Sequence, residues 1–143
     1  MRFTFHGPSV HKGAVVLAGP TASGKTDLAV ALAEKIGAEI VSADSRQVYR
    51  RLDAGTAKPS DSQRARVRHW LLDCADPSEI FDAARWAKEA SSAIADIRAR
   101  GKIALVCGGT GLYLRALLEG LSPLPPRDES LRARLHAEAE SLG

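Results

Sequence analysis

The stretch of sequence that decides the fold reads Gly19-Pro20-Thr21-Ala22-Ser23-Gly24-Lys25-Thr26. It matches the P-loop pattern G-x-x-x-x-G-K-[ST] at every fixed position. The glycines let successive backbone N–H groups converge on phosphate oxygens, at the positive end of the helix that follows. Lys25 adds a mobile positive charge for the outer phosphates, and the hydroxyl of Thr26 can bind Mg²⁺. We therefore predict that these eight residues bind a di- or triphosphate.

The segments on both sides of this motif have the pattern of a βαβ unit. Residues 14–17 are apolar at consecutive positions, which predicts a strand buried on both faces, as in a parallel sheet. Residues 26–36 predict a helix. Its apolar stripe consists of Leu28, Leu32 and Ile36 at four-residue spacing. Residues 39–42 predict a second strand, which follows after the crossover length that parallel strands require.

Further along the chain, predicted strands and helices continue to alternate. Residues 46–68 are polar and basic, and we interpret them as an extended surface segment with one helical piece at 60–67. Further strands are predicted at 70–73 and 103–106. Three further helices are predicted. The first begins at a cap formed by Asp82 and ends at Gly101, the second spans residues 112–119, and the third spans residues 128–141, after the proline-rich stretch 123–126. Strands that alternate with helices indicate an α/β domain on a parallel sheet, here with about four strands.

Composition and charge place the chain among soluble globular proteins. Apolar residues make up 45% and charged residues 26%, and the formal net charge is +3. This mildly basic balance is compatible with a nucleic-acid partner, although most such proteins simply have a solvated basic face. The chain has no apolar run of the ~20 residues that a membrane span needs, and residues 1–12 lack the apolar core of a signal peptide. We therefore expect a cytoplasmic protein without a membrane segment.

A carboxylate near the P-loop bears on what happens to the phosphate. In P-loop ATPases and GTPases an Asp at the end of another strand holds the metal, but the strand at 103–106 ends in Cys107-Gly108-Gly109. The nearest candidate is Asp44, just past the second strand. Because the carboxyl ends of parallel strands gather along one crevice, Asp44 is expected to face the P-loop, as a general base or beside a metal-bound water. An Asp that starts a loop or caps the next turn explains the position equally well.

A glycine-rich run follows the strand at 103–106. It reads Gly108-Gly109-Thr110-Gly111, on the same rim as the P-loop and Asp44. Glycines there permit the close approach of a ligand, and Thr110 offers a hydroxyl, although a simple tight turn is the alternative. Three such strand ends on one rim favour a binding site more strongly than any one of them alone.

Together these segments resemble the tRNA dimethylallyltransferase family, also called tRNA isopentenyltransferases. The P-loop has the narrow Pro-Thr-Ala-Ser form of that family. The other blocks, in the family's order, are Ser-Ala-Asp-Ser-Arg-Gln-Val-Tyr at 42–49, Gly-Thr-Ala-Lys-Pro at 55–59, Gly-Gly-Thr-Gly-Leu-Tyr at 108–113 and Leu-Leu-Glu-Gly-Leu at 117–121. One departure, Cys74-Ala75-Asp76-Pro77 where the family often has Ile-Arg-Asp-Pro, lies off these blocks.

The resemblance implies transfer of a dimethylallyl group from dimethylallyl diphosphate to N6 of the adenosine next to the anticodon in tRNA, with release of diphosphate. The P-loop would then hold a leaving group, with Mg²⁺ on Thr26, and Asp44 would take the proton from the attacking amine. Contacts with tRNA are implied for Asp44, Ser45, Arg46, Gln47, Thr110 and Arg132. Family members usually act as monomers.

The resemblance also implies a division of the chain. Residues 1–120 correspond to a P-loop NTPase-like core, and residues 121–143 to the start of a helical tRNA-binding insertion. Because family members are longer, we expect an incomplete sheet, and a chain that binds phosphate but turns over poorly by itself.

Three other interpretations stay open at this point. A small-metabolite P-loop kinase shares the strand, loop and helix, and an Asp after the second strand; read alone, the motif indicates ATP or GTP. A related prenyltransferase would act on free adenine nucleotides instead of tRNA. A non-enzymatic chain would bind phosphate or RNA without chemistry.

Overall fold

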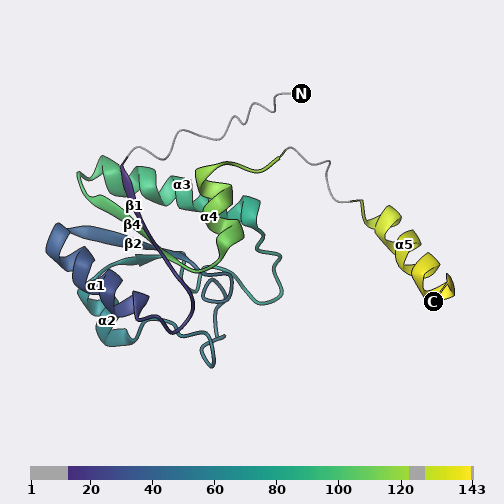
Figure 1. The fold of residues 1–143 in the computed structure, drawn as a ribbon, viewed down its shortest axis with the longest axis horizontal. Helices are drawn as coiled ribbons and strands as arrows, with labels where there is room; N and C mark the ends of the chain where they lie inside the picture. The colour runs from purple at the N-terminus through teal and green to yellow at the C-terminus, as the bar shows by residue number, and fades with distance from the viewer. Residues whose placement is uncertain (1–12, 123–127, 143) are drawn as a thin grey trace.

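Four parallel strands form one sheet in the order β1-β4-β2-β3 (Figure 1). They are β1 (Ala14–Ala18), β2 (Ala38–Ala43), β3 (His69–Trp70) and β4 (Ile103–Gly108). The structure is a computed structural model that describes residues 13–122 and 128–142. The leader at 1–12 and the proline-rich stretch at 123–126 lie outside the described residues. The prediction of an α/β fold on a parallel sheet is confirmed.

Helices cover both faces of the sheet (Figure 1). The described residues form α1 (Lys25–Ile36), α2 (Asp61–Arg66), α3 (Ala83–Ala99), α4 (Gly111–Leu118) and α5 (Glu129–Leu142). One apolar cluster joins α3 and α4 to β2 and β4, and a second joins α1 to the opposite face of the same two strands. The core therefore lies on both faces of the central strands β2 and β4. The helices on the two faces position the loops at the carboxyl ends of these strands.

Strand β1 is more exposed than its sequence predicts. Val15 and Val16 are 44% and 36% exposed, so the expectation of a strand buried on both faces is wrong. The reason is the strand order: among the residues that the structure describes, β1 lies at an edge of the sheet and pairs with β4 alone. The central strand β2, in contrast, is buried at every residue, although it includes the polar residues Glu39 and Ser42.

Helix α1 also turns a different face to the sheet from the one predicted. Its buried residues are Ala29, Val30 and Ala33, while Leu28 is 56% exposed. Ala29, Val30 and Ala33 pack into the apolar cluster with β2 and β4, so Leu28 is left on the solvent side, while Leu32 and Ile36 only border the cluster.

Strand β3 is shorter than the predicted 70–73 segment. Leu71 and Asp73 have positive φ angles of 59° and 50°, and the left-handed backbone ends the extended conformation. Strand β4, in contrast, continues two residues past the prediction, and Gly108 pairs with Ala43 at its end.

Helix α3 confirms its predicted apolar face. Trp86, Ala90, Ile94 and Ile97 are all buried, and the Asp82 carboxylate accepts a hydrogen bond from Arg85 N at 2.8 Å, which caps the helix. The Trp86 ring stacks on Tyr113 of α4 at 4.8 Å between centroids, and its Nε1 donates to Ser42 O at 2.9 Å. Burial raises the pKa of Tyr113 to about 12. These contacts tie both helices to β2 directly below its carboxyl end.

Helix α5 has no buried residue, and Leu131 and Leu135 are 42% and 52% exposed. It lies apart from the sheet and its covering helices (Figure 1). No helix within residues 13–122 and 128–142 combines the length and the apolar character needed to cross a membrane.

A buried carboxylate near the amino end of β2 makes stability depend on pH. Glu39 is 2% exposed; it accepts hydrogen bonds from both terminal nitrogens of Arg100, at 2.6 and 2.8 Å, and from Lys102 and Trp70. The hydrogen bonds from Arg100, supported by those from Trp70 and Lys102, hold the pKa of Glu39 well below its ordinary value of 4.5, against the opposing effect of burial. The unfolded chain therefore takes up this proton before the folded chain does.

We expect Glu39→Gln to lower the free energy of unfolding at pH 7 by about 1–3 kcal/mol, because three ionic hydrogen bonds are weakened. The stabilisation by Glu39 is present above pH 4.5 and is lost as the pH falls below that value. Urea unfolding at pH 7 and pH 3.5 should thus show a smaller acid loss in the variant than in the wild type. Equal acid losses would contradict this role of Glu39.

Candidate active site

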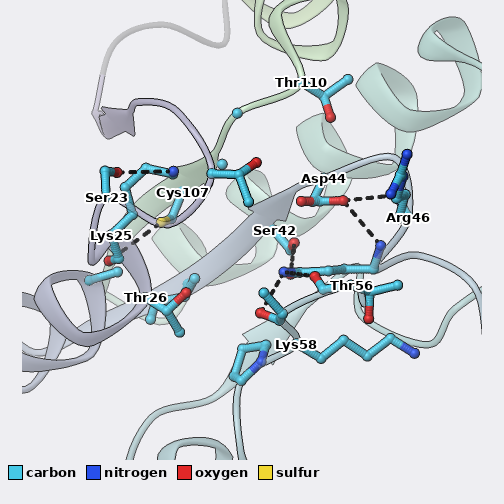
Figure 2. Close-up of a pocket in the computed structure, with 18 of the residues that line it drawn as sticks. Ser23, Lys25, Thr26, Ser42, Asp44, Arg46, Thr56, Lys58, Cys107 and Thr110 are labelled. Carbon is cyan, nitrogen blue, oxygen red and sulfur yellow. Dashed lines mark hydrogen bonds between the residues drawn. The ribbon is translucent and has the colours of Figure 1, made fainter. Parts of the chain in front are cut away.

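The loops after β1, β2 and β4 meet at one edge of the sheet and line a cavity of about 620 Å³ (Figure 2). The fourth wall comes from residues 55–59, a segment that follows β2 in the chain but precedes α2. The predicted gathering of the three strand ends on one rim is confirmed. Of the P-loop, residues 21–26 line the cavity, while Gly19 and Pro20 form the part of the loop next to β1.

The P-loop begins α1 through two left-handed residues. Ala22 has a φ of 63° and Gly24, which caps the helix, a φ of 77°. The ammonium of Lys25 folds back across the loop, where it donates to Pro20 O and, at 3.3 Å, to Ser23 Oγ. The Ser23 hydroxyl itself donates to Pro20 O at 2.8 Å. The positive charge is therefore held at the mouth of the loop, beside the amino end of α1.

Asp44 caps the turn after β2 and also lines the cavity. Its Oδ1 accepts hydrogen bonds from Arg46 N at 2.8 Å and Gln47 N at 3.2 Å, so one oxygen caps the turn after β2. The other oxygen points to the opposite side, toward the interior of the cavity that Lys25 and Thr26 also line (Figure 2). The two backbone N–H groups thus fix the orientation of the carboxylate.

Two glycines bring the rim loops together. A Cβ at Gly108 would lie 2.2 Å from Ala43 O, and a Cβ at Gly109 would lie 2.9 Å from Gly19 O. The close approach that sequence reasoning assigned to a ligand is therefore made by the protein's own backbone. Thr110 completes the junction, since its Oγ1 accepts a hydrogen bond from Ser45 N at 3.0 Å.

The remaining predicted tRNA contacts divide between the cavity and α5. Ser45, Arg46, Gln47 and Thr110 line the cavity with Asp44. Gln47 uses its amide within the protein: Nε2 donates to Thr56 O and Ala57 O at 3.1 and 3.0 Å, and Ser42 Oγ donates to Oε1 at 3.2 Å. Arg132 lies on α5 and is not among the residues that line the cavity.

Sequence reasoning assigned no role to three other residues of the cavity. Lys58, His69 and Cys107 all line it. His69 is half-buried, and burial lowers its pKa, opposed by its hydrogen bond with Val67 O. Burial raises the pKa of the Cys107 thiol, against the charge of Lys25. Only Lys58 could have been noticed earlier, because it belongs to the 55–59 block.

The donor set fits Mg²⁺, which keeps several waters and takes one or two oxygen ligands from the protein alongside phosphates. The Thr26 hydroxyl is one of several side-chain oxygens that line the cavity and could serve as such a ligand. Within the described part of the chain, no group of three His, Cys, Asp or Glu side chains is arranged to hold a metal by itself. Any metal here would therefore depend on the phosphates.

The chain combines a parallel sheet with a P-loop that begins α1 and a cavity at the carboxyl ends of β1, β2 and β4. These features define a P-loop protein of the α/β class. A model of the IPP transferase family matches residues 47–143. The chain belongs to this family.

Known proteins that resemble the chain carry matching names. A tRNA dimethylallyltransferase of Anaeromyxobacter sp. (strain Fw109-5) is 63% identical over 129 residues, which are 90% of this chain and 43% of that protein. The tRNA dimethylallyltransferase of Sorangium cellulosum (strain So ce56) is 54% identical over 129 residues, 90% of this chain and 41% of that protein. The chain spans less than half the length of these curated relatives.

Two solved structures have the same fold. The full-length tRNA isopentenylpyrophosphate transferase from Bacillus halodurans superimposes with a TM-score of 0.75 at 41% identity, covering 90% of this chain and 43% of that one. A eukaryotic dimethylallyltransferase described as acting on tRNA gives a TM-score of 0.74 at 33% identity, covering 82% of this chain and 30% of that one.

Proposed function

We propose that the chain provides the site at which a dimethylallyl group passes from dimethylallyl diphosphate to N6 of the adenosine next to the anticodon in tRNA. The observation that carries this proposal is the oriented Asp44 carboxylate, which shares one cavity with a P-loop. Membership of the IPP transferase family and the names of the relatives support it. We further propose a cytoplasmic protein that acts as a monomer.

In the proposed reaction the P-loop N–H groups and Lys25 hold the diphosphate. The N6 amine attacks C1 of the dimethylallyl group, the C1–O bond breaks, and its electron pair leaves with the diphosphate. Asp44 accepts the proton that N6 loses, which requires the two groups to come within about 3 Å. Mg²⁺ bound with Thr26 would neutralise charge on the diphosphate. The adenine must leave its stack to reach Asp44, at a cost of a few kcal/mol.

Residues on the other side of the cavity would receive the tRNA. Ser45, Arg46 and Thr110 surround Asp44, and Arg46 is a cation that suits a phosphate of the anticodon loop. We propose that Gln47 acts on tRNA mainly through the loop it holds, and that Arg132 of α5 contacts a more distant part of the RNA.

The test is a transfer assay with radiolabelled dimethylallyl diphosphate, Mg²⁺ and tRNA, followed by digestion and analysis of N6-modified adenosine. We expect slow transfer of label to tRNA, in keeping with the poor turnover expected of the chain by itself, and no label on free AMP or ATP, with ATP competing weakly for the P-loop. Label on free nucleotides would favour the related prenyltransferase. Phosphoryl transfer from Mg-ATP to a small hydroxyl acceptor would favour the kinase, and binding without any transfer the non-enzymatic alternative.

Lys25→Met should weaken the binding of dimethylallyl diphosphate by about 10- to 100-fold, because one charge-assisted contact to the phosphates is lost. Isothermal titration in the presence of Mg²⁺ measures this directly. Lys35→Met is the matched control, since Lys35 lies in the last turn of the same helix and is exposed. Equal affinities for the wild type and Lys25→Met would remove the P-loop from the proposal.

A further inference from the structure

Lys58 is a buried lysine whose hydrogen-bonding capacity is fully used. Its side chain is 5% exposed. The ammonium donates to Tyr49 O at 2.8 Å, to Asp53 Oδ1 at 2.8 Å and to Asp73 Oδ1 at 2.6 Å. An ammonium has three donors, and burying it is costly unless each finds a partner. Burial lowers its pKa, but the hydrogen bonds with Asp53 and Asp73 outweigh this and raise the pKa overall.

The side chain of Lys58 extends away from the interior of the cavity (Figure 2). Lys58 lines the cavity as part of the 55–59 segment, whereas its ammonium contacts Tyr49 O and the Asp73 carboxylate. Lys58 therefore anchors residues 55–59 on the side away from the cavity and does not reach toward a substrate. This separates it from Lys25, which carries its charge at the mouth of the P-loop.

Arg64 anchors the other end of the same segment. Its Nη1 lies 2.9 Å from Asp73 Oδ2, and its Nε donates to Pro59 O at 3.0 Å. Asp73 thus bonds Lys58 through one oxygen and Arg64 through the other. Asp73 lies three residues after β3 and has a positive φ of 50°.

The inner side of the wall is connected to Asp44. Ala57 has a positive φ of 50°, a conformation that an alanine rarely adopts and that neighbouring contacts must maintain. Gln47 bonds the carbonyls of Thr56 and Ala57 through its side chain, and its backbone N–H donates to Asp44 Oδ1. Lys58 follows Ala57 directly in the chain, so the anchored ammonium is linked to the carboxylate through the backbone of the wall and the hydrogen bonds of Gln47.

We propose that Lys58 is a positioning residue for the acceptor side of the site: by anchoring residues 55–59 it fixes Gln47 and, through Gln47, the Asp44 loop against which the adenosine is placed. This proposal rests on the proposed function for the identity of the acceptor. It predicts that loss of Lys58 weakens the binding of RNA more than that of diphosphate, because no P-loop residue is a partner in the hydrogen bonds that link Lys58, Asp73, Gln47 and Asp44.

Two measurements on the whole chain test the proposal with Lys58→Met, and with Lys88→Met on exposed α3 surface as the control. Hydrogen exchange should become at least tenfold faster at the amides of residues 45–47, whose N–H groups are hydrogen-bonded, and stay unchanged in α1. The affinity for an anticodon stem-loop RNA should fall about tenfold, while that for dimethylallyl diphosphate changes less than twofold. Unchanged exchange at residues 45–47, or equal losses for both ligands, would overturn the proposal.

Asp53→Asn is a milder variant that keeps the proposal testable if Lys58→Met fails to fold. Asp53 is 75% exposed on its side chain and supplies one of the three acceptors, so its loss should shift exchange and RNA affinity in the same direction by a smaller factor. If the wild type binds both ligands without transferring the prenyl group, the proposed function fails. The exchange pattern and the difference between the two affinities still decide the role of Lys58.

Discussion

Replacing Asp44 by asparagine should reduce transfer of the dimethylallyl group to tRNA by about 10²–10⁴-fold, the usual contribution of a positioned general base. Asparagine retains an Oδ1 that can accept the hydrogen bonds from Arg46 N and Gln47 N, so the turn after β2 should keep its shape. It lacks the basic second oxygen that points into the cavity. Single-turnover transfer of radiolabel measures the rate, and titration with dimethylallyl diphosphate should show an unchanged affinity.

Asp82→Asn is the matched control for this prediction. Asp82 also caps a backbone N–H through its Oδ1, that of Arg85 at 2.8 Å, but it is not among the residues that line the cavity. We expect the control to transfer at the wild-type rate. If Asp44→Asn keeps more than a tenth of that rate while the control is normal, then Asp44 serves as a cap and another group takes the proton.

The local parts of the site could be predicted from the sequence. The P-loop is one contiguous motif that determines its own backbone geometry, and the strand before it and the helix after it follow from the same residues. Asp44 was found because the carboxyl ends of parallel strands face one crevice. A cap and a group facing the cavity could not be told apart from the sequence, because one carboxylate caps the turn through Oδ1 and also lines the cavity.

Properties that depend on the order of strands could not be predicted in this way. Val15 and Val16 have the pattern of a central strand, yet β1 lies at the edge. Nothing in a single strand's composition tells which neighbours it will pair with. The same holds for Gly108 and Gly109, whose partners are Ala43 and Gly19 on two other strand ends.

The network around Lys58 was missed for a different reason. It depends on left-handed backbone at Ala57 and Asp73. Alanine and aspartate do not indicate a positive φ in a sequence as glycine does. A lysine in a polar and basic segment is expected to be solvated, because lysine is almost never fully buried without a partner. The partners, Tyr49 O and Asp73, come from segments that the sequence does not place together.

Gly108→Ala should destabilise the fold by about 3 kcal/mol or more, the second large effect we expect. A Cβ at this position would lie 2.2, 2.5 and 2.8 Å from the O, C and Cα atoms of Ala43. All three belong to the backbone of β2, which is buried along its whole length and cannot yield as a flexible side chain would. The strands β2 and β4 would have to separate at the point where both enter the cavity rim.

Gly111→Ala is the control that isolates this steric effect. Gly111 lies three residues further on, begins α4, and has no atom within 4 Å of its ideal Cβ. Alanine there should be neutral or slightly stabilising, because alanine has a higher helix propensity than glycine. Urea unfolding of both variants measures the difference. A Gly108→Ala variant as stable as Gly111→Ala would contradict the close contact between Gly108 and the backbone of Ala43.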